Sequence, residues 1–130
     1  MQSNRRTGTK PERLLASALH RRGLRFRRDL YWKDPDAGAR TYIDIAFTAR
    51  RIAVFVDGCA WHGCADHPFT PKTNSDYWAR KIERNVARDK RLNAALSAAG
   101  WRVLRVWEHD AIQAAADRVQ AVVRGSEGQR

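Results

Sequence analysis

One short segment of the chain, FVDGCAWHGCADH (residues 55–67), concentrates side chains that bind metal ions. It holds both cysteines of the 130-residue chain and two of its four histidines. Three of these ligands follow one another at C-x4-C-x2-H spacing: Cys59, Cys64 and His67. A structural zinc needs four ligands, and His109 and His62 are the candidates for the fourth position. The alternative is a pair of free, buried cysteines near surface histidines.

Two carboxylates lie within or directly at the end of apolar stretches that are typical of β-strands. Asp44 interrupts the run TYIDIAF, and Asp57 ends the run IAVFVD. If residues 48–51 form a hairpin turn, Asp57 lies opposite Tyr42 and on the same face as Asp44, so that the two carboxylates can share one hydrated cation. A slip of one residue would separate them. Oxygen ligands with open water sites suit Mg²⁺ and phosphodiester hydrolysis, whereas pairing of Asp44 with an arginine is the alternative.

Two further residues of the segment can act on a substrate. His62 follows Asp57 by five residues, and a histidine beside a cation and an acidic pair can be a general base or a general acid. A histidine buried in the core is the alternative. Its neighbour Trp61 can stack on bases or wedge between them, or it can simply cover the zinc.

The order of the predicted helices and strands defines the fold class. Thr9 and Glu12 form a capping box at the start of the first helix. The predicted elements are helix 9–22, strand 24–31, strand 41–47, strand 52–57, helix 76–99, strand 101–107 and helix 111–124. A loop covers residues 33–39, and a longer loop, of a length that is usually functional, covers residues 58–74. The pattern predicts an α/β fold with a central mixed sheet flanked by helices, in the order α-β-β-β-α-β-α.

Composition and charge limit the compartment and the partners of this chain. We expect one domain over residues 9–124, between flexible segments 1–8 and 125–130. The net charge is +11 and the pI is near 10.8, so nucleic acid is the expected partner, because basic side chains displace counterions from phosphates. An acidic protein partner is the alternative. The sequence contains neither a membrane-spanning run nor a signal peptide, which predicts a cytoplasmic protein.

Basic and polar side chains beyond the metal-binding segment are candidates for DNA contacts. The long predicted helix carries basic residues beside its apolar stripe: Lys81, Arg84 and Arg88. The loop before that helix offers polar residues that suit phosphate contacts: Lys72, Thr73 and Asn74. Contacts of this kind position a protein on the DNA backbone.

Six stretches of the chain together resemble the Vsr-type very short patch repair endonucleases: GTKPE, IDIAF, VFVDGCAWHGC, PKTN, YWARKIERNVARDKRLN and GWRVLRVWEH. The resemblance covers residues 7–110. These bacterial enzymes have a restriction-endonuclease-like core, cut one strand 5′ to the thymine of a T·G mismatch, require Mg²⁺ and carry one structural Zn²⁺. The resemblance implies a bacterial, nucleoid-associated protein that acts as a monomer on mismatched double-stranded DNA, with mismatch-repair proteins as further partners.

The resemblance also implies a role for each residue of the predicted site. Asp44 is the metal-binding aspartate, and the backbone carbonyl of Val56 also contacts the magnesium. His62 activates water or assists the leaving group, and Glu12 bonds to water on the metal. Trp61 enters the DNA stack at the mismatch. The zinc ligands fall on Cys59, Cys64, His67 and His109.

Two positions depart from the family pattern. Asp57 stands where the best-studied form has histidine, and we expect it to add a magnesium ligand and to change the role of His62. Ala60 replaces a bulky phenylalanine beside Trp61, which weakens the wedge on which strict T·G specificity depends. The leading hypothesis is a Mg²⁺-dependent DNA endonuclease that nicks one strand at a T·G mismatch in very short patch repair. The alternatives are a restriction or defence nuclease of the same fold that cuts unmismatched DNA, and a zinc-stapled DNA-binding module without catalysis.

Overall fold

The computed structural model describes residues 10–58 and 75–127 of the chain. Their elements are α1 (Lys10–Arg21), β1 (Arg27–Asp34), β2 (Ala39–Phe47), β3 (Ile52–Asp57), α3 (Ser75–Ala98), β4 (Arg102–Trp107) and α4 (Ile112–Glu127). The order α-β-β-β-α-β-α confirms the order that the sequence predicts. Within the described ranges, no helix combines the length and the apolar character that a membrane crossing requires.

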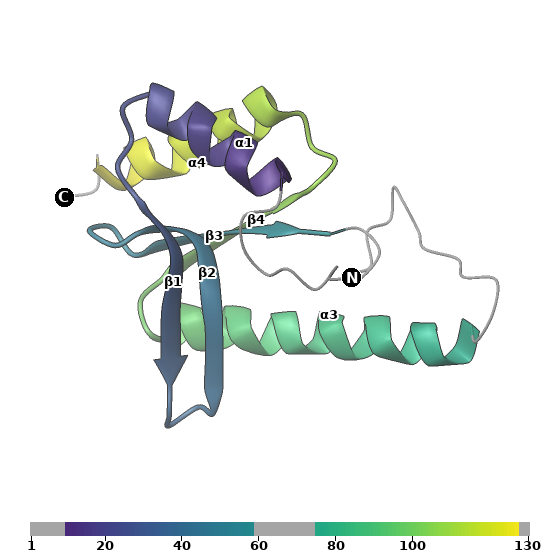
Figure 1. Ribbon diagram of the computed structural model, residues 1–130. Helices are drawn as coiled ribbons and strands as arrows, with labels where there is room; N and C mark the ends of the chain where they lie inside the picture. Colours follow the sequence, from purple (N-terminus) through teal and green to yellow (C-terminus); the bar gives the residue numbers. More distant parts are fainter. Residues whose placement is uncertain (1–9, 59–74, 128–130) are drawn as a thin grey trace.

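The strands form one mixed sheet in the order β1-β2-β3-β4. The first three strands pair antiparallel, and β3 pairs parallel with β4. Helices α1 and α4 cover one face of the sheet, and α3 lies on the other face with its N-terminal part extending past the strands (Figure 1). The predicted α/β class with a central mixed sheet is therefore confirmed.

The core forms two apolar clusters, one on each side of the sheet. On the α1 and α4 side, Leu19 and Val119 pack with Val54 of β3. On the α3 side, Leu96 packs with Phe55, the next residue of β3. Because successive residues of a strand point to opposite faces, a strand covered on both sides needs an unbroken apolar run, which explains the sequence of β3.

The hairpin between β1 and β2 corrects the predicted boundaries. The sequence predicts a strand at 24–31 and a loop at 33–39, whereas β1 runs from Arg27 to Asp34 and β2 already begins at Ala39. A tight turn replaces the loop, because Asp34 Oδ1 accepts hydrogen bonds from the N–H groups of the next two turn residues after Pro35, at 3.1 and 3.4 Å. Gly38, at φ 66°, closes the turn in the left-handed region that glycine tolerates.

The second hairpin has the predicted geometry. Residues 48–51 form the turn between β2 and β3, and Phe47 pairs with Ile52. This register determines which residues of β2 and β3 lie close together, and it is the register on which the predicted magnesium site depends.

Candidate active site

Two aspartates face each other across the irregular middle of the β1–β2 pair. The register pairs Arg28 with Ile45 and Leu30 with Ile43, so Asp29 lies across from Asp44. Asp29 has φ 56°, in the left-handed region that few residues other than glycine, asparagine and aspartate adopt. Two like charges directly opposite each other destabilise a sheet. This pair therefore needs a proton or a cation between its carboxylates.

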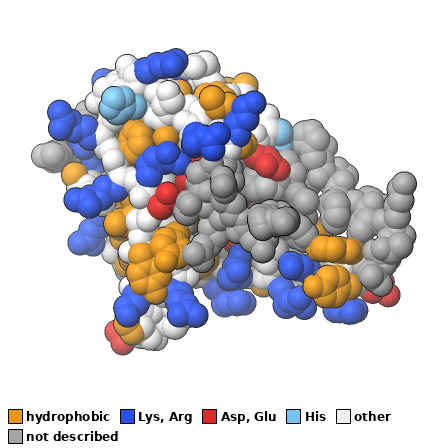
Figure 2. Space-filling view, viewed as in Figure 1, with side chains coloured by type: hydrophobic (Ala, Val, Ile, Leu, Met, Phe, Trp, Pro, Cys, Tyr) orange, Lys and Arg blue, Asp and Glu red, His pale blue; other side chains and the backbone are white. Residues whose placement is uncertain are grey.

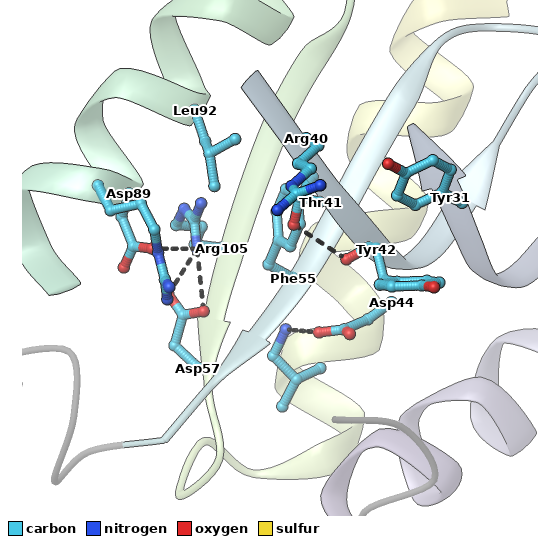
Figure 3. Close-up of a pocket in the computed structure, with 12 residues that line it drawn as sticks. Tyr31, Arg40, Thr41, Tyr42, Asp44, Phe55, Asp57, Asp89, Leu92 and Arg105 are labelled. Atoms are coloured by element: carbon cyan, nitrogen blue, oxygen red, sulfur yellow. Dashed lines mark hydrogen bonds and ion pairs between the residues drawn. The ribbon is translucent and has the colours of Figure 1, made fainter. Parts of the chain in front are cut away.

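Asp44 also replaces a strand hydrogen bond with its own side chain. The β2–β3 pairs run from Phe47–Ile52 to Ile45–Val54. Beyond them, Asp44 Oδ2 accepts a hydrogen bond from the N–H of Val56 at 2.9 Å (Figure 3). The aspartate and the end of β3 are thus held together by a bond between a side chain and the backbone.

Glu12 adds a third carboxylate from the first turn of α1. Ligand oxygens of Glu12, Asp29 and Asp44 all lie within 4.8 Å of one another. Glu12 is only 1% exposed, and its Oε2 and Asp29 Oδ1 are buried without a hydrogen-bond partner. The guanidinium of Arg28 lies 3.3 Å from Glu12 Oε2, as an ion pair without hydrogen-bond geometry. An unmade hydrogen bond on a buried oxygen costs about 1–3 kcal/mol, so this cluster suits an additional positive charge.

The neighbouring carboxylates raise the proton affinity of Asp44 and of Glu12. Burial is the main cause that raises the pKa of Asp44 to about 7, with Glu12, Asp57 and Asp29 adding repulsion and the Val56 N–H opposing it. Burial and the neighbouring Asp29 also raise the pKa of Glu12, and Arg28 opposes that rise. Groups whose charged forms disfavour one another are characteristic of metal-binding and catalytic sites.

The donor set fits a hard divalent cation. Carboxylate oxygens, with water at the remaining positions, are what Mg²⁺ binds in proteins. Glu12 and Asp29, which form this cluster with Asp44, each also have one buried oxygen without a hydrogen-bond partner. The three carboxylates are therefore consistent with a site for a divalent metal ion.

A cleft of about 580 Å³ gives access to Asp44. Tyr31, Tyr42 and Arg40 line it (Figure 3). Two further basic residues, Arg88 and Arg105, also line the cleft. The cleft therefore combines basic side chains that can contact a phosphate with the carboxylates of Asp44, Asp57 and Asp89.

Asp57 is engaged by an arginine that the sequence analysis did not single out. Arg105 Nη1 lies 3.0 and 3.2 Å from the two carboxylate oxygens of Asp57, and Arg105 Nε donates to Asn93 Oδ1 at 2.9 Å. The guanidinium also lies 4.4 Å from the ring centroid of Phe55, and Asp89 Oδ1 is 3.9 Å from Nη1 (Figure 3). Asp57 lines the cleft, but it is not a member of the carboxylate cluster among the described residues.

Some of the remaining predicted site residues lie within the described residues, and the others lie outside them. Arg84 and Arg88 are exposed on α3, and the Lys81 ammonium lies 5.8 Å from the ring centroid of Trp78. His109 follows β4, and its ring stacks at 6.4 Å on Trp107. The other predicted site residues lie outside the described residues, as does Ala60: Cys59, Trp61, His62, Cys64, His67, Lys72, Thr73 and Asn74.

Asp29 and Arg105 are the site residues that sequence reasoning missed. The four-residue turn after Asp34 places Asp29 opposite Asp44. The sequence analysis missed this relation because the run KDPDAGA suggests a longer loop. Arg105 interrupts the apolar strand WRVLRVW in the same way that Asp44 interrupts TYIDIAF. That interruption could have identified Arg105 as a candidate site residue. Pairing β3 parallel with β4 puts Arg105 beside Phe55, two residues before Asp57.

Comparisons with known proteins indicate the family of this chain. Residues 1–68 match the family model described as DNA mismatch endonuclease Vsr. The Type II nicking enzyme V.NaeI of Lentzea aerocolonigenes is 54% identical over 123 residues, which cover 95% of this chain and 72% of that protein. The Type II nicking enzyme V.XorIIP of Xanthomonas oryzae pv. oryzae is 47% identical over 110 residues, covering 83% and 76%. The DNA mismatch endonuclease Vsr of Escherichia coli is 39% identical over 98 residues, covering 75% and 59%.

Family model and relatives agree on one kind of enzyme. Several further relatives carry the name Type II nicking enzyme, among them V.NmeDIP of Neisseria meningitidis and V.HpaIIP of Haemophilus parainfluenzae. The resemblance inferred from the motifs is thereby confirmed. The chain belongs to the Vsr family of DNA nicking endonucleases.

Proposed function

We propose that this chain cuts one strand of duplex DNA with a magnesium ion held by Asp44, Glu12 and Asp29. The observation that supports the proposal most directly is the convergence of three carboxylates with two buried oxygens that lack hydrogen-bond partners. A purely structural role does not explain why Glu12 is buried against two aspartates. An apolar residue at this buried position would give a more stable protein.

Each residue of the site has a proposed part in the reaction. When bound, Mg²⁺ supplies positive charge against the phosphate oxygens and acidifies water. Asp44 anchors the ion and, through the N–H of Val56, holds the end of β3 so that the Val56 carbonyl can serve as a further ligand. His62 moves the proton of the attacking water or of the leaving group. Asp57 keeps its place through Arg105 and adds negative charge near the ion.

We further propose that Cys59, Cys64, His67 and His109 hold one structural zinc. Support comes from the ends of β3 and β4, because the N–H of Glu108 donates to the carbonyl of Asp57 at 2.9 Å. Asp57, two residues before Cys59, therefore lies beside Glu108, the residue before His109. A zinc at this place would tie the segment after β3 to the end of β4 and stabilise both.

The names of the relatives favour a particular substrate setting. Most of those reported above are called Type II nicking enzymes, whereas the family model and the E. coli protein are named for DNA mismatches. We propose a nicking enzyme of the Type II kind. Cleavage at T·G mismatches in very short patch repair is the narrower hypothesis, because Ala60 stands where the resemblance leads us to expect a bulky aromatic residue.

A nicking assay separates these functions. Duplexes with each of the possible mismatches and a fully paired duplex are incubated with Mg²⁺ or with EDTA, using wild type and Asp44→Asn. We expect Mg²⁺-dependent single-strand cuts by wild type and a loss of at least a thousandfold for Asp44→Asn, because an anchor carboxylate is removed. Cutting confined to T·G would support the mismatch hypothesis, and cutting of paired DNA would support the alternative. Undiminished cutting by Asp44→Asn would refute the assigned site.

Metal binding is tested independently of activity. The affinity for Mg²⁺ or Mn²⁺ is measured by calorimetry on wild type, Asp29→Asn and Asp36→Asn. Asparagine tolerates the left-handed backbone of Asp29, so Asp29→Asn removes charge without a conformational penalty. We expect at least tenfold weaker binding for Asp29→Asn and unchanged binding for Asp36→Asn, whose exposed side chain lies at the hairpin turn. Equal affinities in all three proteins would exclude Asp29 from the site.

A further inference from the structure

An exposed pair of tyrosines lies at the mouth of the cleft. Tyr31 and Tyr42 are direct cross-strand partners in the β1–β2 hairpin, with ring centroids 5.1 Å apart and an interplanar angle of 51°. They are 47% and 38% exposed. The neighbours of Tyr31 in the strand, Leu30 and Trp32, pack against the core cluster of Leu96, so alternation along the strand directs Tyr31 away from that cluster. The rings of Tyr31 and Tyr42 are therefore exposed to solvent, whereas Leu30 and Trp32 are packed against the core.

The surroundings of this tyrosine pair carry positive charge. Arg40 and Arg88 line the same cleft as both tyrosines, and each is exposed. Figure 2 shows hydrophobic side chains flanked by basic ones over the region of the β1–β2 hairpin, at the lower left of the view. The turn at the tip of the hairpin is held by the Asp34 side chain. The pair is therefore presented on a braced hairpin beside guanidinium groups.

We propose that Tyr31 and Tyr42 form a stacking platform for a base of the bound DNA, with Arg40 and Arg88 contacting its flanking phosphates. Aromatic rings combined with a positively charged groove are the general means of holding an unstacked base, and each stacked base contributes about 1–3 kcal/mol. The arginines distinguish this occupant from an apolar peptide, which would gain nothing from them. The inference rests on the proposed function, because the DNA enters through the same cleft.

The geometry also places the base along the strand. Tyr42 precedes Asp44 by two residues of β2, and a strand rises about 3.3 Å per residue, so their backbones are roughly 7 Å apart. One strand of B-DNA rises about 3.4 Å per nucleotide. For a DNA strand that runs along β2, a base on the platform lies about two nucleotides from the phosphate at Asp44. The tyrosines thus act on recognition next to the cut and not on the bond that is broken.

Photo-crosslinking tests the platform directly. 5-Iododeoxyuridine, which crosslinks to stacked aromatic side chains on irradiation, is placed in turn at each of the four positions on either side of the nick. Ca²⁺ replaces Mg²⁺ so that the DNA stays intact, and crosslinked peptides are identified by mass spectrometry. We expect a maximum about two nucleotides from the nick, on the peptides that contain Tyr31 or Tyr42. The crosslink should be lost in Tyr31→Ala and Tyr42→Ala and kept in the phenylalanine variants, which retain the ring.

Affinity measurements complete the test. Each alanine variant should bind DNA at least about fivefold more weakly, while the phenylalanine variants and Tyr77→Ala, an equally exposed tyrosine on α3, should bind as wild type does. Thermal unfolding verifies that the variants fold. Crosslinks found only on other peptides, or alanine variants that bind like wild type, would overturn the platform. The affinities are obtained from binding alone, so failure of the wild type to nick would count against the proposed function and not against the platform.

Discussion

Replacing Asp44 with asparagine should stabilise the metal-free protein at neutral and alkaline pH. The Asp44 carboxyl has its pKa raised to about 7 from an ordinary value of 3.8, chiefly by burial. The folded state therefore holds a proton at pH values where the unfolded state has lost it. Since stability falls with pH wherever the folded state binds more protons, wild type must lose stability as the pH rises from about 4 to about 7. Asp44→Asn has no proton to lose and keeps an oxygen that can accept the Val56 N–H.

The size of the effect follows from the same values. A difference of one pKa unit corresponds to about 1.4 kcal/mol. Between pH 5 and pH 7, Asp44 alone should lower the free energy of unfolding of wild type by roughly 2 kcal/mol. Glu12, whose pKa is also raised by burial, acts in the same direction. The advantage of Asp44→Asn over wild type should therefore grow by about 2 kcal/mol over this range.

Urea unfolding in EDTA at pH 5, 6, 7 and 8 measures this difference, with Asp36→Asn as the control for loss of an exposed carboxylate. At pH 8, addition of Mg²⁺ should restore stability to wild type and leave Asp44→Asn unchanged, because the ion binds only the folded, charged site. Curves for wild type and Asp44→Asn that stay parallel from pH 5 to pH 8 would refute the assignment of a raised pKa to Asp44.

Three further predictions concern other parts of the site. Arg105→Met should lower the free energy of unfolding by about 3 kcal/mol, because the buried carboxylate of Asp57 loses its guanidinium partner. The double variant Arg105→Met/Asp57→Leu should recover most of the loss in urea unfolding. Metal analysis should find one zinc per chain in wild type, and less zinc together with a lower melting temperature in His109→Ala; full zinc occupancy in that variant would exclude His109. Arg88→Ala should reduce the slope of log affinity for duplex DNA against log salt by about 1, and an unchanged slope would mean that Arg88 contacts no phosphate.

Much of the fold can be predicted from this sequence because its elements carry strong local signals. The apolar run of β3 and the turn at 48–51 led to the correct register with β2, and Asp44 was recognisable because it interrupts a strand that is otherwise apolar. The helix boundaries followed from glycines at their C-terminal ends: Gly23 has φ 81° and Gly100 has φ 93°. These signals act over a few residues, so no knowledge of the tertiary structure is needed to detect them.

The parts that could not be predicted depend on contacts between distant segments. Asp29 belongs to the site only because a tight turn closes the β1–β2 hairpin, and a shift of three residues in β1 conceals that relation. Asp57 was predicted to bind magnesium, and that prediction still awaits a metal-binding measurement. Its ion pair with Arg105 was beyond prediction because it depends on a parallel strand that enters the sheet 45 residues later, after α3.

The hydrogen bond from Val56 to Asp44 makes the state of the site visible to spectroscopy without any label. The proton resonance of a backbone amide responds when the carboxylate that accepts its hydrogen bond changes charge. Val56 is therefore a reporter within the chain: the midpoint of its chemical shift against pH follows the ionisation of Asp44, near pH 7 in the metal-free protein. Occupation of the carboxylates by a cation should move that midpoint to lower pH, so one amide signal can record ionisation and ion binding in the intact enzyme.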